Sequence, residues 1–197
     1  MITLADTAAV ILAAGRSQRF GEENKMLHLI NGEPMIKRTV DAVLAAGLGD
    51  VVVVTGQDAD AVERTLQGLP IRCVRNATPW AGMGTSLATG ANAVSAGVQA
   101  MFVVLGDMPH LKTNTILNLL AAMDLQRGHD IIVPVHDGRR GHPVLFAKRY
   151  FTHLCALSGD TGARDILNKH PERVDAVNVD DPGTLIDIDT PDDVRST

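Results

Sequence analysis

The chain has 197 residues, of which 45% are hydrophobic, and a formal net charge of −5 at pH 7. This length supports one sizeable core, so we expect residues 1–197 to form a single domain. The acidic balance disfavours nucleic-acid binding, which needs clustered Lys and Arg, and no apolar run reaches the roughly 18 residues of a membrane span. Cys73 and Cys155 are far apart and fit no zinc or disulfide pattern. We therefore expect a cytoplasmic protein that binds neither nucleic acid nor membrane.

Short apolar runs of strand length alternate with helical patterns along the chain. The predicted strands are residues 8–13, 51–54, 71–74, 101–105, 131–135, 144–146 and 174–179. The predicted helices are residues 35–46, 59–67, 86–95 and 113–126, with a short one near 162–169. This alternation predicts an α/β, Rossmann-like fold whose mostly parallel central sheet has helices on both faces. Residues 138–182 are less regular, and we expect a small insertion there that helps to close a site.

The first motif, LAAGRSQRFGEENK at residues 12–25, follows the first predicted strand. Small residues at a strand end let backbone N–H groups approach an anion closely, and Arg16, Arg19 and Lys25 add positive charge. The alternative is an ordinary turn with solvated basic residues. Neither the Walker spacing nor the dinucleotide-binding spacing of glycines is present. The motif therefore predicts a phosphate-binding loop of another kind.

Carboxylates follow two further apolar segments. Asp107 comes directly after the predicted strand 101–105, at a strand end where a ligand crevice is expected in a parallel sheet. Asp187 and Asp189 alternate with apolar residues, so an extended segment would place both on one face. Carboxylates suit Mg²⁺ bound to phosphates, whereas Asp107 could instead serve a turn, and Asp189 could cap a helix that begins at Pro191.

Three polar segments are candidates for substrate binding. Thr85 and Ser86, in GMGTSL, could bind a base, ribose or phosphate, or could cap the following helix. The segment GRRGHPVLF carries Arg139, Arg140 and His142 beside a predicted strand, and SGDTGARDIL carries Asp160 and Arg164 at a helix start. The last two segments could bind an acceptor, or could be surface and capping residues.

The motifs together resemble those of the MobA-like nucleotidyltransferases, and most closely the CTP:molybdopterin cytidylyltransferases. The matching segments, spread over residues 10–194, are LAAGRSQRFG with Lys25, GMGTSL, LGDMP, GHPVLF, SGDTGAR and DIDTPDD. The resemblance implies a loop around a triphosphate, with Arg19, Lys25 and Asp107 as catalytic residues and Asp107 and Asp187 as metal ligands. The implied nucleotide-binding residues are Leu12, Ala13, Ala14, Gly15, Arg16, Ser17, Arg19, Lys25, Gly82, Gly84, Thr85 and Ser86. The candidate acceptor-binding residues are Gly141, His142, Pro143, Asp160 and Gly162.

The resemblance also implies a reaction. CMP would pass from CTP to the phosphate of a molybdenum-pterin cofactor, with Mg²⁺ or alternatively Mn²⁺, and pyrophosphate would be released. Ala14 favours CTP, since a second glycine there resembles guanylyltransferases. The GMGTSL segment departs from the serine-richer form of the molybdopterin enzymes, so a sugar or polyol phosphate stays open as acceptor. A non-catalytic nucleotide- or cofactor-binding chaperone, and transient docking to a molybdoenzyme, also stay open.

Overall fold

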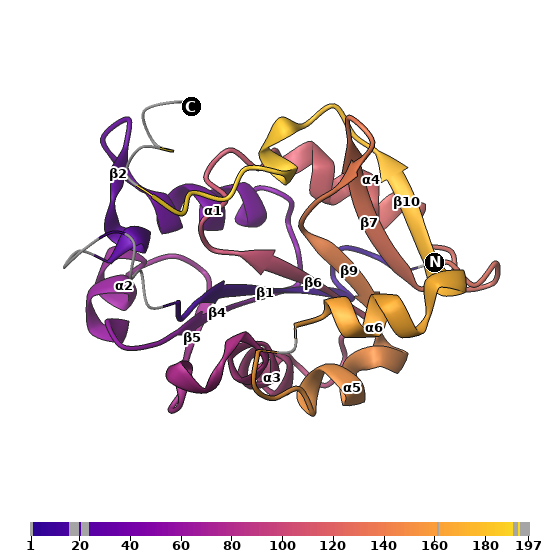
Figure 1. Cartoon of the computed structure of the whole chain (residues 1–197), viewed down its shortest axis with the longest axis horizontal. Helices are drawn as coiled ribbons and strands as arrows, with labels where there is room; N and C mark the ends of the chain where they lie inside the picture. The colour runs from indigo at the N-terminus through magenta and orange to yellow at the C-terminus, as the bar shows by residue number, and fades with distance from the viewer. Residues whose placement is uncertain (1, 16–19, 21–23, 161, 191–192, 194–197) are drawn as a thin grey trace.

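The fold is a central β-sheet with helices on both faces, seen here in a computed structural model that describes residues 2–15, 20, 24–160, 162–190 and 193 (Figure 1). The main sheet has the order β10-β7-β9-β6-β1-β4-β5, with β8 paired to β7. Its strands are β1 (Thr7–Ala13), β4 (Asp50–Thr55), β5 (Arg72–Arg75), β6 (Ala100–Leu105), β7 (Ile131–His136), β8 (Arg139–Arg140), β9 (Val144–Ala147) and β10 (Val174–Asn178). A small hairpin of β2 (Leu29–Ile30) and β3 (Glu33–Pro34) stands apart from it.

The sheet is mostly parallel, as the sequence predicts. β1 pairs in parallel with β4 and β6, β4 with β5, and β7 with β10. The exceptions are β9, which lies antiparallel between β6 and β7, and the short β8, which pairs antiparallel with β7. Every residue of β1 is buried, which agrees with a strand that is covered on both faces.

The helices divide between the two faces according to the alternation of side chains along β1. Ala9 and Ile11 pack with α1, α2 and α4, whereas Val10 packs with α3, α5 and α6 on the other face. The helices are α1 (Met35–Leu44), α2 (Ala59–Thr65), α3 (Met83–Ala93), α4 (Thr113–Ala122), α5 (Phe151–Cys155) and α6 (Arg164–Lys169).

Two helix boundaries differ from the sequence prediction by three residues or more. α4 ends at Ala122 because Met123 has extended backbone angles, so Gly128 belongs to a later turn and does not cap this helix. α3 begins three residues early, at Met83, directly after Gly82, whose φ is 104°. The polar residues of GMGTSL therefore lie inside the first turn of a helix instead of before it.

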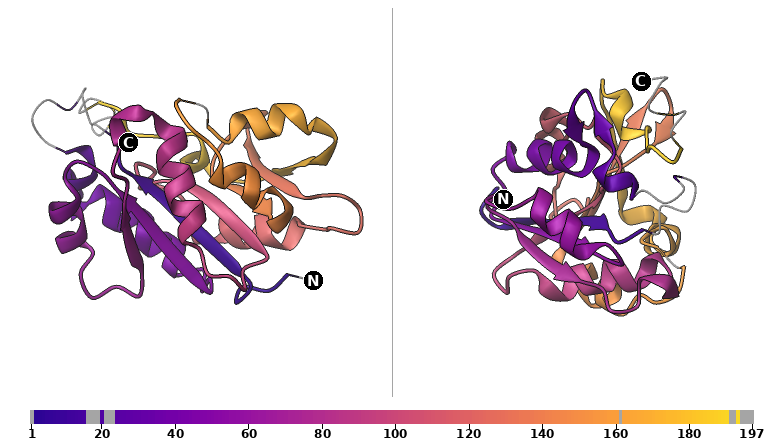
Figure 2. Two further views of the ribbon diagram at one scale, coloured as in Figure 1. Left: turned by 90° about the horizontal axis from the view of Figure 1, so that it is seen from below. Right: turned by 90° about the vertical axis from the view of Figure 1, so that its left-hand side faces the viewer.

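Residues 138–182, expected as a small insertion, are built partly into the sheet. They supply β8, β9 and β10, and they add α5 and α6 to the face that α3 covers. After β10 the chain crosses back towards α1 and β2, as the yellow segment in Figures 1 and 2 shows. This return is fixed by the backbone N–H of Ile188, which donates to the carbonyl of Asp107 at 3.0 Å. Within the described residues, every helix is too short or too polar to span a bilayer.

Candidate active site

A cavity of about 590 Å³ opens where β1 and β6 end. Its walls come from six segments of the chain. The lining residues are Leu12, Ala14, Gly15, Lys25, Met26, Pro79, Trp80, Gly82, Met83, Ser86, Leu105, Asp107, Asp160, Asp187 and Asp189. Ten of these are among the residues that sequence analysis selected. The cavity therefore brings together the strand-end loop, the start of α3 and the carboxylates that follow β6 and β10.

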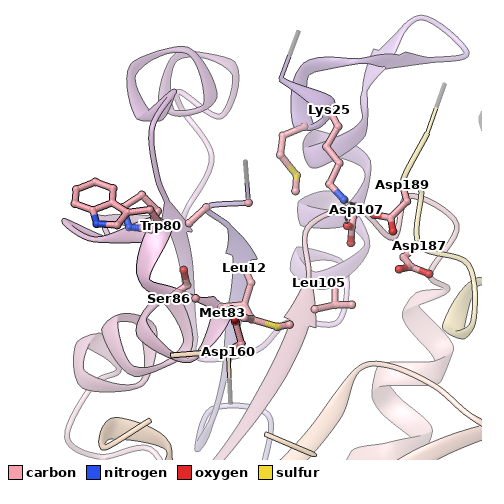
Figure 3. A pocket seen from close by; sticks show the side chains of 15 residues that line it. Leu12, Lys25, Trp80, Met83, Ser86, Leu105, Asp107, Asp160, Asp187 and Asp189 are labelled. Carbon is pink, nitrogen blue, oxygen red and sulfur yellow. Dashed lines mark hydrogen bonds and ion pairs between the residues drawn. The ribbon is translucent and has the colours of Figure 1, made fainter. Parts of the chain in front are cut away.

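A buried ion pair lies at one side of this cavity (Figure 3). The Nζ of Lys25 is 2.5 Å from Asp107 Oδ2 and 3.0 Å from Asp189 Oδ1, and the side chains of Lys25 and Asp107 are only 11% and 13% exposed. Lys25 reaches this position from a 3₁₀ helix, Lys25–Leu27, whose start is capped by the side chain of Asn24. The same ammonium group also donates to the carbonyl of Ile188 at 3.4 Å. Lys25 thus connects the first loop to both carboxylate segments.

Burial and charge act against each other in this pair. Burial alone would lower the pKa of Lys25, but the charges of Asp107 and Asp189 outweigh it and raise that pKa, so the ammonium stays protonated. Burial raises the pKa of Asp107, and the negative charge of Asp187 adds to this, although Lys25 opposes both. The Oδ1 of Asp107 is buried and has no hydrogen-bond partner within the described residues. A cation at that oxygen would supply the missing contact.

Asp187 and Asp189 have different surroundings. Asp189 contacts Lys25 at 3.0 Å. The side chains of Thr190 and Asp193 accept from each other's backbone N–H groups at 3.4 and 2.7 Å. Asp187 lines the cavity and has no ion pair or hydrogen bond with the rest of the described chain. The helix start at Pro191, on which the capping alternative for Asp189 depends, lies outside the described residues.

The carboxylates fit a hard divalent cation in type and position. In the described residues, no group of three or more His, Cys, Asp and Glu side chains converges on a single metal position. Mg²⁺ is commonly held by one or two carboxylates with the remaining positions taken by substrate phosphates and water. Asp107, with its unpartnered oxygen, and Asp187 match that incomplete set of ligands.

The start of α3 forms the opposite side of the cavity, where Figure 3 shows Trp80, Met83 and Ser86 apart from the Lys25 cluster. Gly82 is essential to this geometry, because a Cβ there would lie 2.2 Å from the carbonyl carbon and oxygen of Gly159. The N–H of Gly84 donates to the same carbonyl at 2.9 Å. The close contact holds the start of α3 against the segment that carries Asp160.

The polar residues of this segment are not equivalent. Ser86 lines the cavity, and its Oγ accepts a hydrogen bond from Asn76 at 3.0 Å. Thr85 donates to the carbonyl of Gly82 at 2.8 Å and accepts from Asn76 at 2.9 Å, so its hydroxyl stabilises the helix start, the alternative left open by its sequence. Ala13 and Gly84 do not line the cavity, and Ala13 is buried in the core.

Sequence reasoning missed the apolar rim of the cavity. Trp80 and Met83 are 63% and 51% exposed, which is unusual for large apolar side chains. Trp80 is the single tryptophan of the chain and lies in a short 3₁₀ helix directly before Gly82. An aromatic residue before a glycine-containing turn gives no distinctive pattern, so only the fold places it at the cavity.

The predicted acceptor residues separate into two groups. Asp160 lines the large cavity, whereas Gly141 and His142 line a second one of about 210 Å³. Pro143 is buried behind them, and Gly162 lies outside both cavities. The two cavities share Leu105 and Asp187. Arg16, Ser17 and Arg19, expected around the phosphates, lie outside the described residues, as does Pro191.

Comparison with known proteins identifies the family of this chain. The MobA-like NTP transferase domain matches residues 9–174, which is most of the chain. The chain belongs to the MobA-like NTP transferase family. A curated relative, the nicotine blue oxidoreductase of Paenarthrobacter nicotinovorans, is 32% identical over 92% of this chain and 91% of its own length. A bifunctional GlmU protein of Rhizobium etli is 36% identical over 64% of this chain, which spans only 28% of that longer protein.

Solved structures share the fold of this chain. Rv0371c of Mycobacterium tuberculosis is 27% identical, has a TM-score of 0.82 and is covered over 98% of both chains. The same protein has also been solved in complex with manganese, at a TM-score of 0.76. A CMP:2-keto-3-deoxy-manno-octonic acid synthetase complexed with CTP shares the fold, with a TM-score of 0.72 at 16% identity. This MobA-like chain therefore has the nucleotidyltransferase fold that the sequence predicts.

Proposed function

We propose that this protein transfers CMP from CTP to the phosphate of a molybdenum-pterin acceptor in the cytoplasm, with Mg²⁺ as the metal. The observation that carries the proposal is the buried Lys25–Asp107 pair, with Asp187 beside it, at the end of a strand that finishes in small residues. Membership of the MobA-like NTP transferase family supports the transfer reaction. Ala14 and the LAAG motif support CTP, through the resemblance described above.

The chemistry requires no nucleophile from the protein. An oxygen of the acceptor phosphate forms a bond to the α-phosphorus, and the bond to the β-phosphate oxygen breaks, so that pyrophosphate leaves with the electron pair. Lys25 would contribute positive charge to the reacting phosphates, and Arg19 is expected to add more. Asp107 and Asp187 would hold Mg²⁺, whose bound charge neutralises the triphosphate. The manganese complex of the mycobacterial relative supports Mn²⁺ as an alternative metal.

The experiment combines pyrophosphate release with mass analysis of the product. Purified protein, Mg²⁺ and molybdenum-pterin phosphate are offered CTP, GTP, ATP or UTP in turn. We expect a CMP-containing dinucleotide with CTP and no comparable product with the other three. Product with a sugar or polyol phosphate, and none with the pterin, would replace the acceptor. Nucleotide binding without pyrophosphate release from any acceptor would favour the chaperone alternative.

A second candidate function follows from the relative that is named an oxidoreductase, because it is similar over almost the whole of both chains. Such an enzyme would reduce a planar coloured compound, and NADH or NADPH, as the electron donor, would bind in the same large cavity. Loss of the absorbance of NADH or NADPH with a quinone-like dye tests this directly. Turnover there, with no pyrophosphate release from any nucleotide, would establish the oxidoreductase.

A further inference from the structure

The second cavity, of about 210 Å³, lies beside the large one and is lined mostly by other residues. One wall is the segment from Arg139 to His142, and the other is formed by Thr184 and Leu185. It adjoins the large cavity, because Leu105 and Asp187 line both. A group bound here would therefore share the carboxylate of Asp187 with a nucleotide bound in the large cavity.

Backbone contacts hold the walls of this cavity together. A two-residue turn joins β7 to β8, with positive φ at both Asp137 (48°) and Gly138 (73°), and such a turn matches the twist of a hairpin. Gly141 approaches the other wall so closely that a Cβ would lie 2.2 Å from the carbonyl oxygen of Thr184. The N–H of His142 donates to that same carbonyl at 2.9 Å. The position of the hairpin at the cavity is thus fixed by the backbone.

The charged side chains at this cavity favour the binding of an anion. Arg139 and Arg140 are both exposed, and although their backbones pair with β7, neither guanidinium group has an ion pair or hydrogen bond with another described residue. By contrast, Arg72 and Arg149 each bind a carboxylate of the protein at 2.6 and 2.9 Å. In a chain whose net charge is −5, two guanidinium groups at the mouth of one cavity, with the single carboxylate of Asp187 in its lining, give it a local positive charge that attracts an anion.

A buried polar atom inside the cavity wall points to the same conclusion. The Nδ1 of His142 is buried and has no hydrogen-bond partner in the described residues. Buried polar groups are usually satisfied, so an unpartnered ring nitrogen in a cavity wall indicates a missing ligand or water. Guanidinium groups bind phosphate oxygens in pairs, through two parallel N–H donors, more readily than ammonium groups do.

We propose that the second cavity receives the phosphate monoester of the acceptor, and that Arg139 and Arg140 select for it. The inference rests on the proposed function, because the phosphate would belong to the acceptor of nucleotidyl transfer. It adds the residues that choose the acceptor and the class they choose: small molecules that end in a phosphate, not uncharged hydroxyl acceptors. The small volume accommodates the phosphate and a few further atoms, so the remainder of the acceptor extends outwards.

The kinetic test uses Arg139→Gln, Arg140→Gln and the double variant. We expect the double variant to raise the KM for the acceptor by roughly tenfold or more, from the loss of charged hydrogen bonds, while the KM for CTP stays within about twofold. The double Arg→Lys variant should recover part of the loss. Arg127→Gln is the matched control, because Arg127 is 79% exposed in a distant turn and its removal changes the net charge equally.

A binding test needs no turnover. Glycerol 3-phosphate is titrated calorimetrically, with glycerol as its uncharged counterpart, alone and with α,β-methylene-CTP and Mg²⁺ in the large cavity. We expect wild type and Arg127→Gln to bind glycerol 3-phosphate but not glycerol, and the double Gln variant to lose that binding. Unchanged binding in the double variant, or an equal rise of both KM values, overturns the inference and leaves the proposed function intact. If the double variant loses this binding in a protein that neither binds nor uses nucleotides, the phosphate site at Arg139 and Arg140 stands and the proposed function is overturned.

Discussion

Asp107 is the single residue on which the proposed reaction depends most. Its carboxylate is buried, contacts Lys25 through one oxygen and leaves the other without a partner. We predict that Asp107→Asn lowers turnover by about a hundredfold or more, since charge stabilisation at the reacting phosphates accounts for effects of this size. Pyrophosphate release at saturating Mg²⁺ measures it. Asp124→Asn, at a distant exposed turn, should leave turnover unchanged, and wild-type turnover in Asp107→Asn would refute the assignment.

The positive charge of Lys25 offsets the negative charges of Asp107 and Asp189. We predict that Lys25→Met lowers the free energy of unfolding by about 3 kcal/mol, because Asp107 then keeps a buried charge without its partner. Urea denaturation measures the change, and Lys25→Arg should restore most of it. Added Mn²⁺ should stabilise Lys25→Met more than wild type, since the metal replaces the lost positive charge. Equal stabilisation of the two proteins would contradict this explanation.

At the scale of elements, the start of α3 depends on one close backbone contact. We predict that Gly82→Ala destabilises the protein by about 2 kcal/mol or more, because its φ of 104° strains an L side chain and its Cβ would meet Gly159 at 2.2 Å. Thermal unfolding measures this, and the KM for CTP should rise as α3 and the Asp160 segment separate. Gly97→Ala is the control, with no neighbour within 4 Å of its Cβ and no positive φ. Similar effects of both substitutions would show that the contact is unimportant.

Strands and helices were the features that the sequence predicted best. Each apolar run became a strand within one or two residues, because burial on both faces of a parallel sheet requires such runs. The antiparallel direction of β9 could not be predicted, since an apolar run has no direction. The helix that begins at Met83 was misplaced, because the turn at Gly82 is set by a tertiary contact with Gly159.

The candidate site was predictable where chemistry follows a strand end, as it does for Asp107 and Lys25. It was not predictable for residues whose contacts depend on the tertiary structure. Asp187 and Asp189 are both aspartates and lie two positions apart in one motif, yet only Asp189 contacts Lys25. The exposure of Trp80 at the cavity rim likewise depends on how α3 is held, which no local pattern records.

At the scale of the whole molecule, metal and nucleotide should stabilise the fold together. Among the described residues no three carboxylate, imidazole or thiol side chains converge on one metal position, so in the proposed site phosphate oxygens and water complete the coordination of the metal. We predict that Mg²⁺ alone and CTP alone raise the melting temperature little, while the two together add about 2.7 kcal/mol at a hundred times the dissociation constant. Differential scanning calorimetry measures this. Additive effects of metal and nucleotide would contradict the shared site, and EDTA should abolish turnover without unfolding the protein.

The antiparallel strand β9 has a consequence for how such a protein diversifies. Because β9 runs against β6, with Val144 paired to Val103, the chain enters β9 at the same edge where it leaves β6. If the acceptor is bound as proposed, the residues just before β9 would set which compound is accepted, while the phosphate loop after β1 and the carboxylate after β6 come from other segments of the chain. Substitutions confined to this short stretch would then exchange one acceptor for another and leave the nucleotide half of the site unchanged.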